Sequence, residues 1–158
     1  MAKPIPDGYA SVTPTLTFKD CKKALDFYAK AFGAKDIEIF AGPGGQGIMH
    51  ATMKIGNSIV MMGDEMPGHN KSVQTMGGSP TSLWIYTENA DTLFDRAVKA
   101  GAVSMMPVSD MFWGDRMGSL TDPFGYVWSV ATHTNDLTKE EVRKNADAFF
   151  SKMAGKGA

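Results

Sequence analysis

In the first half of the chain, short runs of alternating polar and apolar residues surround one stretch with helical periodicity. The run Val12–Phe18 alternates as a strand does, and a helical pattern over Cys21–Phe32 follows Asp20 and stops at Gly33. Asp is a good N-cap because its carboxylate accepts free amide hydrogens of the first turn, and glycine accepts the left-handed backbone that ends many helices. Further strands are predicted at Ile37–Phe40, Ile48–Ile55 and Ser58–Met62.

The second half repeats this pattern at an offset of 69 residues. Asp20, Leu25 and Gly56 return as Asn89, Phe94 and Gly125, and the second predicted helix, Ala90–Ala100, stops at Gly101. The strands expected in this half are Ser82–Thr87, Val103–Val108, Met117–Thr121 and Tyr126–Thr132. Such a repeat predicts an α+β fold of two tandem βαβββ modules, related by a pseudo-twofold axis, whose curved mixed sheets form a cup.

Module boundaries follow from the turn residues and from one further helical pattern. We expect a first module at 9–66, a linker at 67–80, a second module at 81–133, and a C-terminal helix and tail at 134–158. The linker, rich in Gly and Pro, could also act as a lid over a site. Thr138 and Glu141 form a capping-box pattern. The helix after them carries an apolar stripe, which we expect to pack on the body or on a second subunit: Val142, Ala146, Phe149, Phe150 and Met153.

Strand alternation predicts which side chains face the cup. In each strand one set of alternate side chains is apolar and is expected to pack under the helices. In Ser58–Met62 this set is Ile59 and Met61. The other set mixes apolar and aromatic walls with hydroxyls and one imidazole, which is typical of a small-molecule pocket, although a half-exposed sheet surface without a ligand would look similar. This inward set is Thr13, Thr15, Thr17, Ile48, His50, Thr52, Val60, Met62, Ser82, Trp84, Tyr86, Met117, Ser119, Thr121, Val127, Ser129 and Ala131.

Composition excludes several classes of partner. The 158 residues include 16 Lys and Arg and 17 Asp and Glu, for a formal charge of −1, so no basic patch indicates nucleic-acid binding. Neither a signal peptide nor a membrane-spanning apolar run is present, and a cytoplasmic protein without a membrane partner is the default expectation. The single cysteine, Cys21, has no nearby histidine in sequence and is expected to be a structural thiol.

Three motifs resemble those of a known family. They are Ala24-Leu25-Asp26-Phe27-Tyr28 after Asp20, Trp113-Gly114-Asp115-Arg116, and Asp122-Pro123-Phe124-Gly125-Tyr126-Val127-Trp128. Together with the module repeat over about residues 9 to 133, they resemble the glyoxalase / bleomycin-resistance / dioxygenase group, the vicinal oxygen chelate superfamily, and especially its PhnB-like branch. The resemblance implies paired βαβββ modules, commonly in a homodimer, and in the enzymes a divalent metal held by side chains from four strands.

The metal positions implied by the resemblance carry unsuitable residues here. They fall on Thr13, Val60, Ser82 and Ser129, whereas zinc, iron and manganese prefer imidazole, thiolate or carboxylate ligands. We therefore expect no metal and no cofactor, as in the metal-free binding members of the family. His50 with Asp64 remains an alternative, unorthodox metal site.

Candidate ligand contacts come from the inward set and from one loop. His50 is the candidate for acid–base chemistry because histidine is the residue type that can gain or lose a proton near neutral pH. The other expected contacts are Thr52, Trp84, Tyr86, Trp113, Ser119 and Ser129. His133 is expected at the surface, and strand parity points Arg116 away from the cup. The sequence therefore favours metal-independent small-molecule binding by a homodimer. A metal-dependent lyase, isomerase or dioxygenase with a rearranged metal site, or a purely structural dimer, remain the alternatives.

Overall fold

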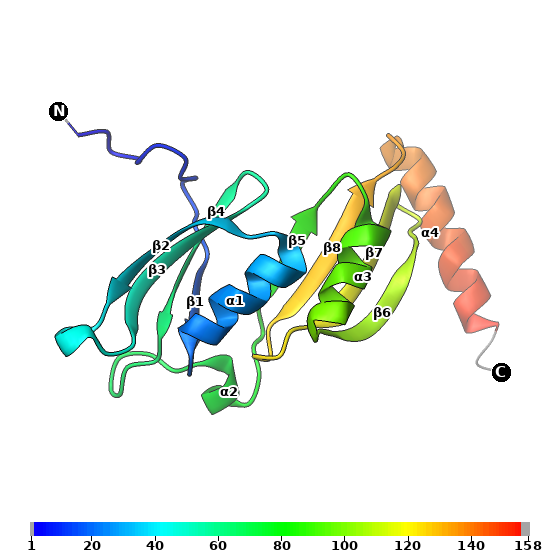
Figure 1. The fold of residues 1–158 in the computed structure, drawn as a ribbon. Helices are drawn as coiled ribbons and strands as arrows, with labels where there is room; N and C mark the ends of the chain where they lie inside the picture. The colour runs from blue at the N-terminus through cyan, green and yellow to red at the C-terminus, as the bar shows by residue number, and fades with distance from the viewer. Residues whose placement is uncertain (1, 156–158) are drawn as a thin grey trace.

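Two four-stranded mixed sheets, each with one helix on one face, make up the body of the computed structural model, which describes residues 2–155 (Figure 1). The first sheet has the order β1-β4-β3-β2 and carries α1. In chain order its elements are β1 (Thr15–Phe18), α1 (Cys21–Phe32), β2 (Lys35–Ala41), β3 (Ile48–Ile55) and β4 (Ser58–Asp64), with a short 3₁₀ turn, η1 (Pro43–Gly45), between β2 and β3.

The second sheet repeats this topology. Its order is β5-β8-β7-β6, with β5 parallel to β8 as β1 is parallel to β4, and it carries α3. Its elements are β5 (Ser82–Tyr86), α3 (Ala90–Ala100), β6 (Val103–Asp110), β7 (Asp115–Thr121) and β8 (Val127–His133). The predicted α+β fold of two βαβββ modules is thereby confirmed.

The predicted caps start and stop the two module helices. Asp20 accepts a hydrogen bond from Lys23 N, and Asn89 accepts one from Thr92 N, so each side chain satisfies a free first-turn amide. Gly33 ends α1 in the left-handed region at φ 68°, where a Cβ would strain the backbone.

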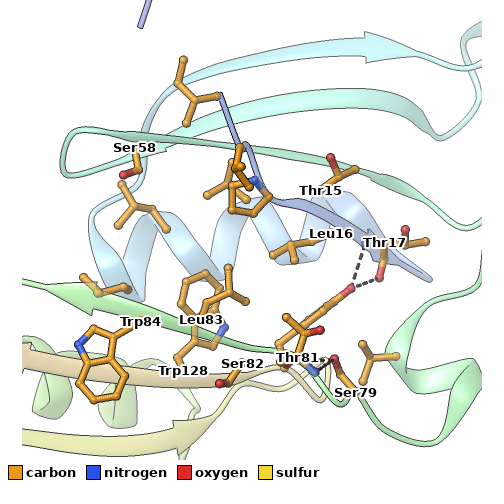
Figure 2. Close-up of a pocket in the computed structure, with 18 of the residues that line it drawn as sticks. Thr15, Leu16, Thr17, Ser58, Ser79, Thr81, Ser82, Leu83, Trp84 and Trp128 are labelled. Atoms are coloured by element: carbon orange, nitrogen blue, oxygen red, sulfur yellow. Dashed lines mark hydrogen bonds between the residues drawn. The ribbon is translucent and has the colours of Figure 1, made fainter. Parts of the chain in front are cut away.

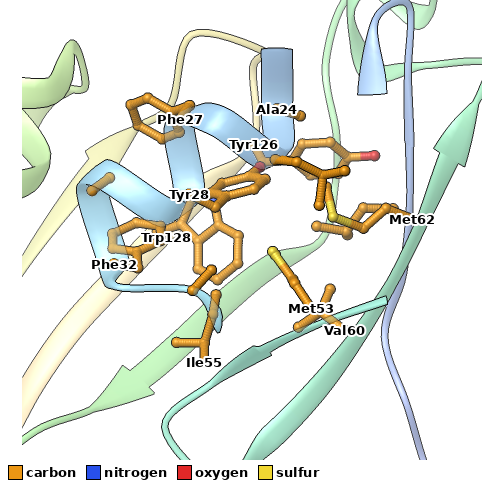
Figure 3. Packing of buried hydrophobic residues seen from close by; sticks show 14 of the residues in the cluster. Ala24, Phe27, Tyr28, Phe32, Met53, Ile55, Val60, Met62, Tyr126 and Trp128 are labelled. Atoms are coloured by element: carbon orange, nitrogen blue, oxygen red, sulfur yellow. The ribbon is translucent and has the colours of Figure 1, made fainter. Parts of the chain in front are cut away.

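An aromatic core joins the two modules. Tyr28 and Phe32 of α1 pack against Trp128 of β8, with ring centroids 5.4 Å and 4.9 Å from it (Figure 3). Beneath them the carboxylate of Asp122 accepts hydrogen bonds from the Tyr28 hydroxyl and from Trp128 Nε1. On the outer side of the helices, Arg96 of α3 donates to the last carbonyls of α1, which have no partner within the helix. These contacts fix the modules side by side.

The predicted orientation of β4 is wrong. Val60 and Met62 lie opposite Met53 and Ala51 in the antiparallel ladder, and residues directly opposite share a face. Val60 is 4% exposed and Met62 is 1% exposed, under α1. The open face of β4 instead carries Ile59 and Met61, which had been expected under the helix.

A one-residue slip in the repeat explains this error. The amide of Cys21 at the start of α1 donates to Asp64, and the amide of Ala90 at the start of α3 donates to Thr132. The two helix starts are 69 residues apart, but their two acceptors are 68 apart. Because strand side chains alternate with a period of two, a one-residue change in offset exchanges the two faces.

Two further helices lie outside the modules. The segment predicted as a linker holds a single helical turn, α2 (Val73–Met76), and Glu65 accepts hydrogen bonds from Ser72 N and the Thr75 hydroxyl. At the other end, α4 (Lys139–Ala154) begins at the predicted capping box of Thr138 and Glu141.

The apolar stripe of α4 is only partly covered. Phe149 and Phe150 contact Phe112, with ring centroids 5.5 Å and 5.9 Å from it, yet they and Met153 stay exposed. Within residues 2–155 no helix has the length and apolar character to cross a membrane.

Candidate functional site

A cleft of about 1260 Å³ opens between the two modules, where edge strands β1 and β5 both contribute to its lining (Figure 2). Its apolar wall includes Leu16, Leu83 and Trp128, which belong to the margin of the core. Hydroxyl groups surround this wall: Thr15, Thr17, Ser58, Ser79, Thr81 and Ser82. Among the lining residues only Lys71 carries a charge, so the site is mostly apolar with several polar groups, as small-molecule pockets are.

Two aromatic side chains of β5 form an exposed pair at this cleft. Trp84 is 46% exposed and Tyr86 is 63% exposed, and their ring centroids lie 6.0 Å apart at an angle of 39°. Both belong to the open face of the second sheet, because the intervening Ile85 packs against the core. We call Trp84 and Tyr86 the aromatic pair.

Behind the aromatic pair lies a buried carboxylate with three donors. Asp115 is 3% exposed. Its Oδ2 accepts hydrogen bonds from the Tyr86 hydroxyl at 2.9 Å and from Trp113 Nε1 at 3.0 Å, and its Oδ1 lies 2.7 Å from His133 Nδ1. His133 Nε2 lies 3.0 Å from Asp136 Oδ1. We call Asp115, Tyr86, Trp113 and His133 the Asp115 network.

The network sets the protonation states of its members. Burial alone would raise the pKa of Asp115, but hydrogen bonds from His133, Tyr86 and Trp113 outweigh it, and the pKa falls below its usual value. The hydrogen bond to Asp115, with a second one to Asp136, raises the pKa of His133. The pKa of Tyr86 is raised as well, mainly because its proton bonds to Asp115. The network therefore favours an ionised Asp115 that accepts hydrogen bonds from Tyr86, Trp113 and His133.

The predicted contact residues divide between this cleft and other parts of the described structure. Trp84 and Tyr86 line the cleft, whereas His50, Thr52, Trp113, Ser119 and Ser129 are not among its lining residues. His50 lies opposite Phe40 on the open face of the first sheet, with ring centroids 6.1 Å apart. Ser119 and Ser129 lie opposite each other on the open face of the second sheet.

The four positions that the resemblance assigns to metal ligands do not suit a divalent metal. After the correction of β4 they are Thr13, Met61, Ser82 and Ser129, because Met61 pairs with Thr15 as Ser129 pairs with Trp84. Hydroxyl and thioether groups are poor ligands for zinc, iron or manganese. Across residues 2–155, no three or more His, Cys, Asp or Glu side chains are arranged to hold a metal ion.

The alternative site of His50 and Asp64 is also not assembled. Asp64 accepts hydrogen bonds from the amides of Cys21 and Ile48, under the start of α1, whereas His50 lies on the open face. Arg116 points away from the open face as expected, and it pairs with Asp91 and Asp110.

The sequence alone did not identify Asp115 and His133 as members of one network. His133 does lie at the surface as expected, with a side chain 51% exposed, and it stands opposite the buried Asp115 on the open face at the end of the β7–β8 ladder. The available signal was parity: Asp115 shares a face with Met117 and Ser119, and His133 shares one with Ser129 and Ala131.

Comparisons with known proteins give the family of the chain. The family model described as Glyoxalase/Bleomycin resistance protein/Dioxygenase superfamily matches residues 10–130. Two uncharacterized mycobacterial proteins are 33% identical over 137 residues, which are 84% of this chain, 90% of the Mycobacterium bovis protein and 80% of the Mycobacterium tuberculosis protein.

Two solved structures show the same fold. TioX from Micromonospora sp. ML1 has 24% identity and a TM-score of 0.60, over 82% of this chain and 100% of that one. The PhnB protein from Bacillus cereus has 22% identity and a TM-score of 0.59, over 78% of this chain and 99% of that one. The family model over residues 10–130, together with the repeated βαβββ modules, establishes that the chain belongs to the glyoxalase/bleomycin resistance protein/dioxygenase superfamily.

Proposed function

We propose that this chain is a metal-independent binding protein that sequesters a small aromatic molecule in the cleft between its modules. The aromatic pair carries the proposal, because two large side chains of a strand stay exposed beside a cleft of about 1260 Å³. Exposed aromatic faces at a concave site offer stacking surface for a planar ligand. Poor metal ligands at the four family positions support binding without metal chemistry.

The test measures binding of a planar aromatic probe, 2-naphthol, by ligand-observed NMR titration. Trp84→Leu removes the stacking face and should weaken binding about tenfold, or ~1.4 kcal/mol. The matched control is Phe150→Leu, which removes another exposed aromatic ring, 59% exposed on α4 and away from the cleft. If the two variants bind the probe equally well, the cleft is not the ligand site.

We further propose that two copies of the chain form a homodimer. Strands β2 and β6, at the sheet edges away from the cleft, are each paired on one side only, and unpaired strand edges favour association. Large apolar side chains also remain exposed on other elements, among them Phe40, Met105 and Phe150. Light scattering at micromolar concentration should give twice the chain mass of 17.0 kDa; a mass of one chain would contradict the proposal.

A second copy would cover open sheet faces on which the remaining predicted contacts lie. His50, Thr52, Ser119 and Ser129 therefore stay predictions for ligand contacts in the dimer. His50→Ala should lower the affinity for a ligand bound by the dimer about tenfold without unfolding the protein. Unchanged affinity in the folded variant would remove His50 from the site, while the Trp84 test would still stand.

A further inference from the structure

We propose that Tyr86 makes the cleft selective for aromatic ligands that carry a hydrogen-bond donor, such as a hydroxyl or an amine. The inference rests on the proposed function, since it assigns a chemical class to the ligand of the same cleft. It derives from the direction of one hydrogen bond, between the Tyr86 hydroxyl and Asp115 Oδ2.

The proton of Tyr86 is committed to the carboxylate. An ionised carboxylate can only accept hydrogen bonds, so in this pair the tyrosine must donate. A phenol hydroxyl has a single hydrogen. Once that hydrogen is donated to Asp115, the oxygen can offer only lone pairs to a ligand. Because Tyr86 is 63% exposed and lines the cleft, its side chain is within reach of a bound molecule. To a ligand, Tyr86 is an acceptor.

Burial of Asp115 keeps Tyr86 in this role. The carboxylate is 3% exposed, and two of its donors are fixed by the fold: Trp113 Nε1 at 3.0 Å and His133 Nδ1 at 2.7 Å. A ligand acceptor could take the Tyr86 proton only if the buried carboxylate lost its third donor, which is unfavourable. A ligand donor meets no such penalty.

Neighbouring hydroxyls do not impose the same preference. Thr15, Thr81 and Ser82 line the cleft, and a threonine or serine hydroxyl can rotate to donate or to accept. Tyr86 is also the polar tip of the aromatic pair, 6.0 Å from Trp84 between ring centroids. A ring stacked on Trp84 would therefore place its substituent near an oxygen that only accepts.

The experiment compares two neutral probes with the same rings, 2-naphthol and 2-methoxynaphthalene. Both carry an acceptor oxygen, and only the first carries a donor. Wild-type protein should bind 2-naphthol about five- to tenfold more tightly, the range expected for one net hydrogen bond. Tyr86→Phe, which keeps the ring, should bring this ratio close to one by weakening the naphthol alone. Ser109→Ala removes an exposed hydroxyl of β6 that does not line the cleft and should leave the ratio unchanged.

The possible results distinguish aromatic binding in the cleft from selectivity for a hydrogen-bond donor. If wild-type protein binds both probes equally and Trp84→Leu weakens both, the cleft binds aromatic ligands and the donor selectivity is wrong. If neither probe binds, or if Trp84→Leu changes nothing, the proposed function and the selectivity fail together. A preference for naphthol that survives in folded Tyr86→Phe would also overturn the assignment to Tyr86. The wild-type ratio alone tests the inference even where a variant does not fold.

Discussion

Removal of the buried carboxylate of Asp122 should destabilise the protein more than any surface substitution. Asp122 lies in the turn between β7 and β8 and is 4% exposed. It accepts hydrogen bonds from the Tyr28 hydroxyl at 2.5 Å, from Trp128 Nε1 at 2.9 Å, and from the amides of Phe124 and Tyr126. Since Tyr28 belongs to the first module and Asp122 to the second, this carboxylate holds the two modules together.

The loss in free energy of unfolding caused by Asp122→Ala follows from the buried donors that lose their acceptor. Tyr28 is 0% exposed and Trp128 is 2% exposed, so water does not readily replace the lost partner of either. An unsatisfied buried donor costs about 1–3 kcal/mol, and two of them, with a small cavity, amount to ~3–5 kcal/mol. A domain of this size is stable by roughly 5–15 kcal/mol in total. The substitution should therefore remove a large share of the stability.

Urea unfolding followed by circular dichroism measures the effect. The matched control is Asp110→Ala, which removes an exposed carboxylate 3.1 Å from Arg116 and should cost less than about 1 kcal/mol. In a Tyr28→Phe background, loss of Asp122 should cost less, because one stranded donor is already gone. A loss below about 1 kcal/mol for Asp122→Ala, equal to that of the control, would refute the account of the inter-module core.

Two further predictions concern titration and reactivity. His133 has a raised pKa in the folded state, mainly through Asp115, so its contribution to stability is complete below its usual pKa of 6.5 and is lost as pH rises through the folded value. Denaturant titrations from pH 6 to 9 should show this loss, and His133→Gln should reduce it; an unchanged pH profile would contradict the network. The pKa of the Cys21 thiol is raised to about 12, mainly by burial and then by the nearby Asp64 and Asp20. Native protein at pH 8 should therefore resist iodoacetamide, whereas urea-unfolded protein should be alkylated. Mass spectrometry measures the alkylation, and rapid alkylation of the native protein would contradict the burial of Cys21.

The sequence by itself determined the elements and their family. Helices α1 and α3 have the predicted bounds because their start and stop signals are local: Asp20 and Asn89 cap amides three residues on, and a glycine follows the last turn. The capping box at Thr138 is equally local. Repetition of this arrangement, with its short strands, was sufficient to predict two βαβββ modules.

The tertiary structure decided which faces and which side chains meet. The ladder between β3 and β4 places Val60 under α1 and Met61 on the open face. The 69-residue offset could not predict this, because a one-residue change in register exchanges the two faces of a strand. Trp113 is only two residues from Asp115. Tyr86 and His133, in contrast, are 29 and 18 residues away, and only the pairing of β5, β7 and β8 brings them to the same carboxylate. Local signals act over a few residues, whereas a binding site depends on contacts between strands that the sequence separates.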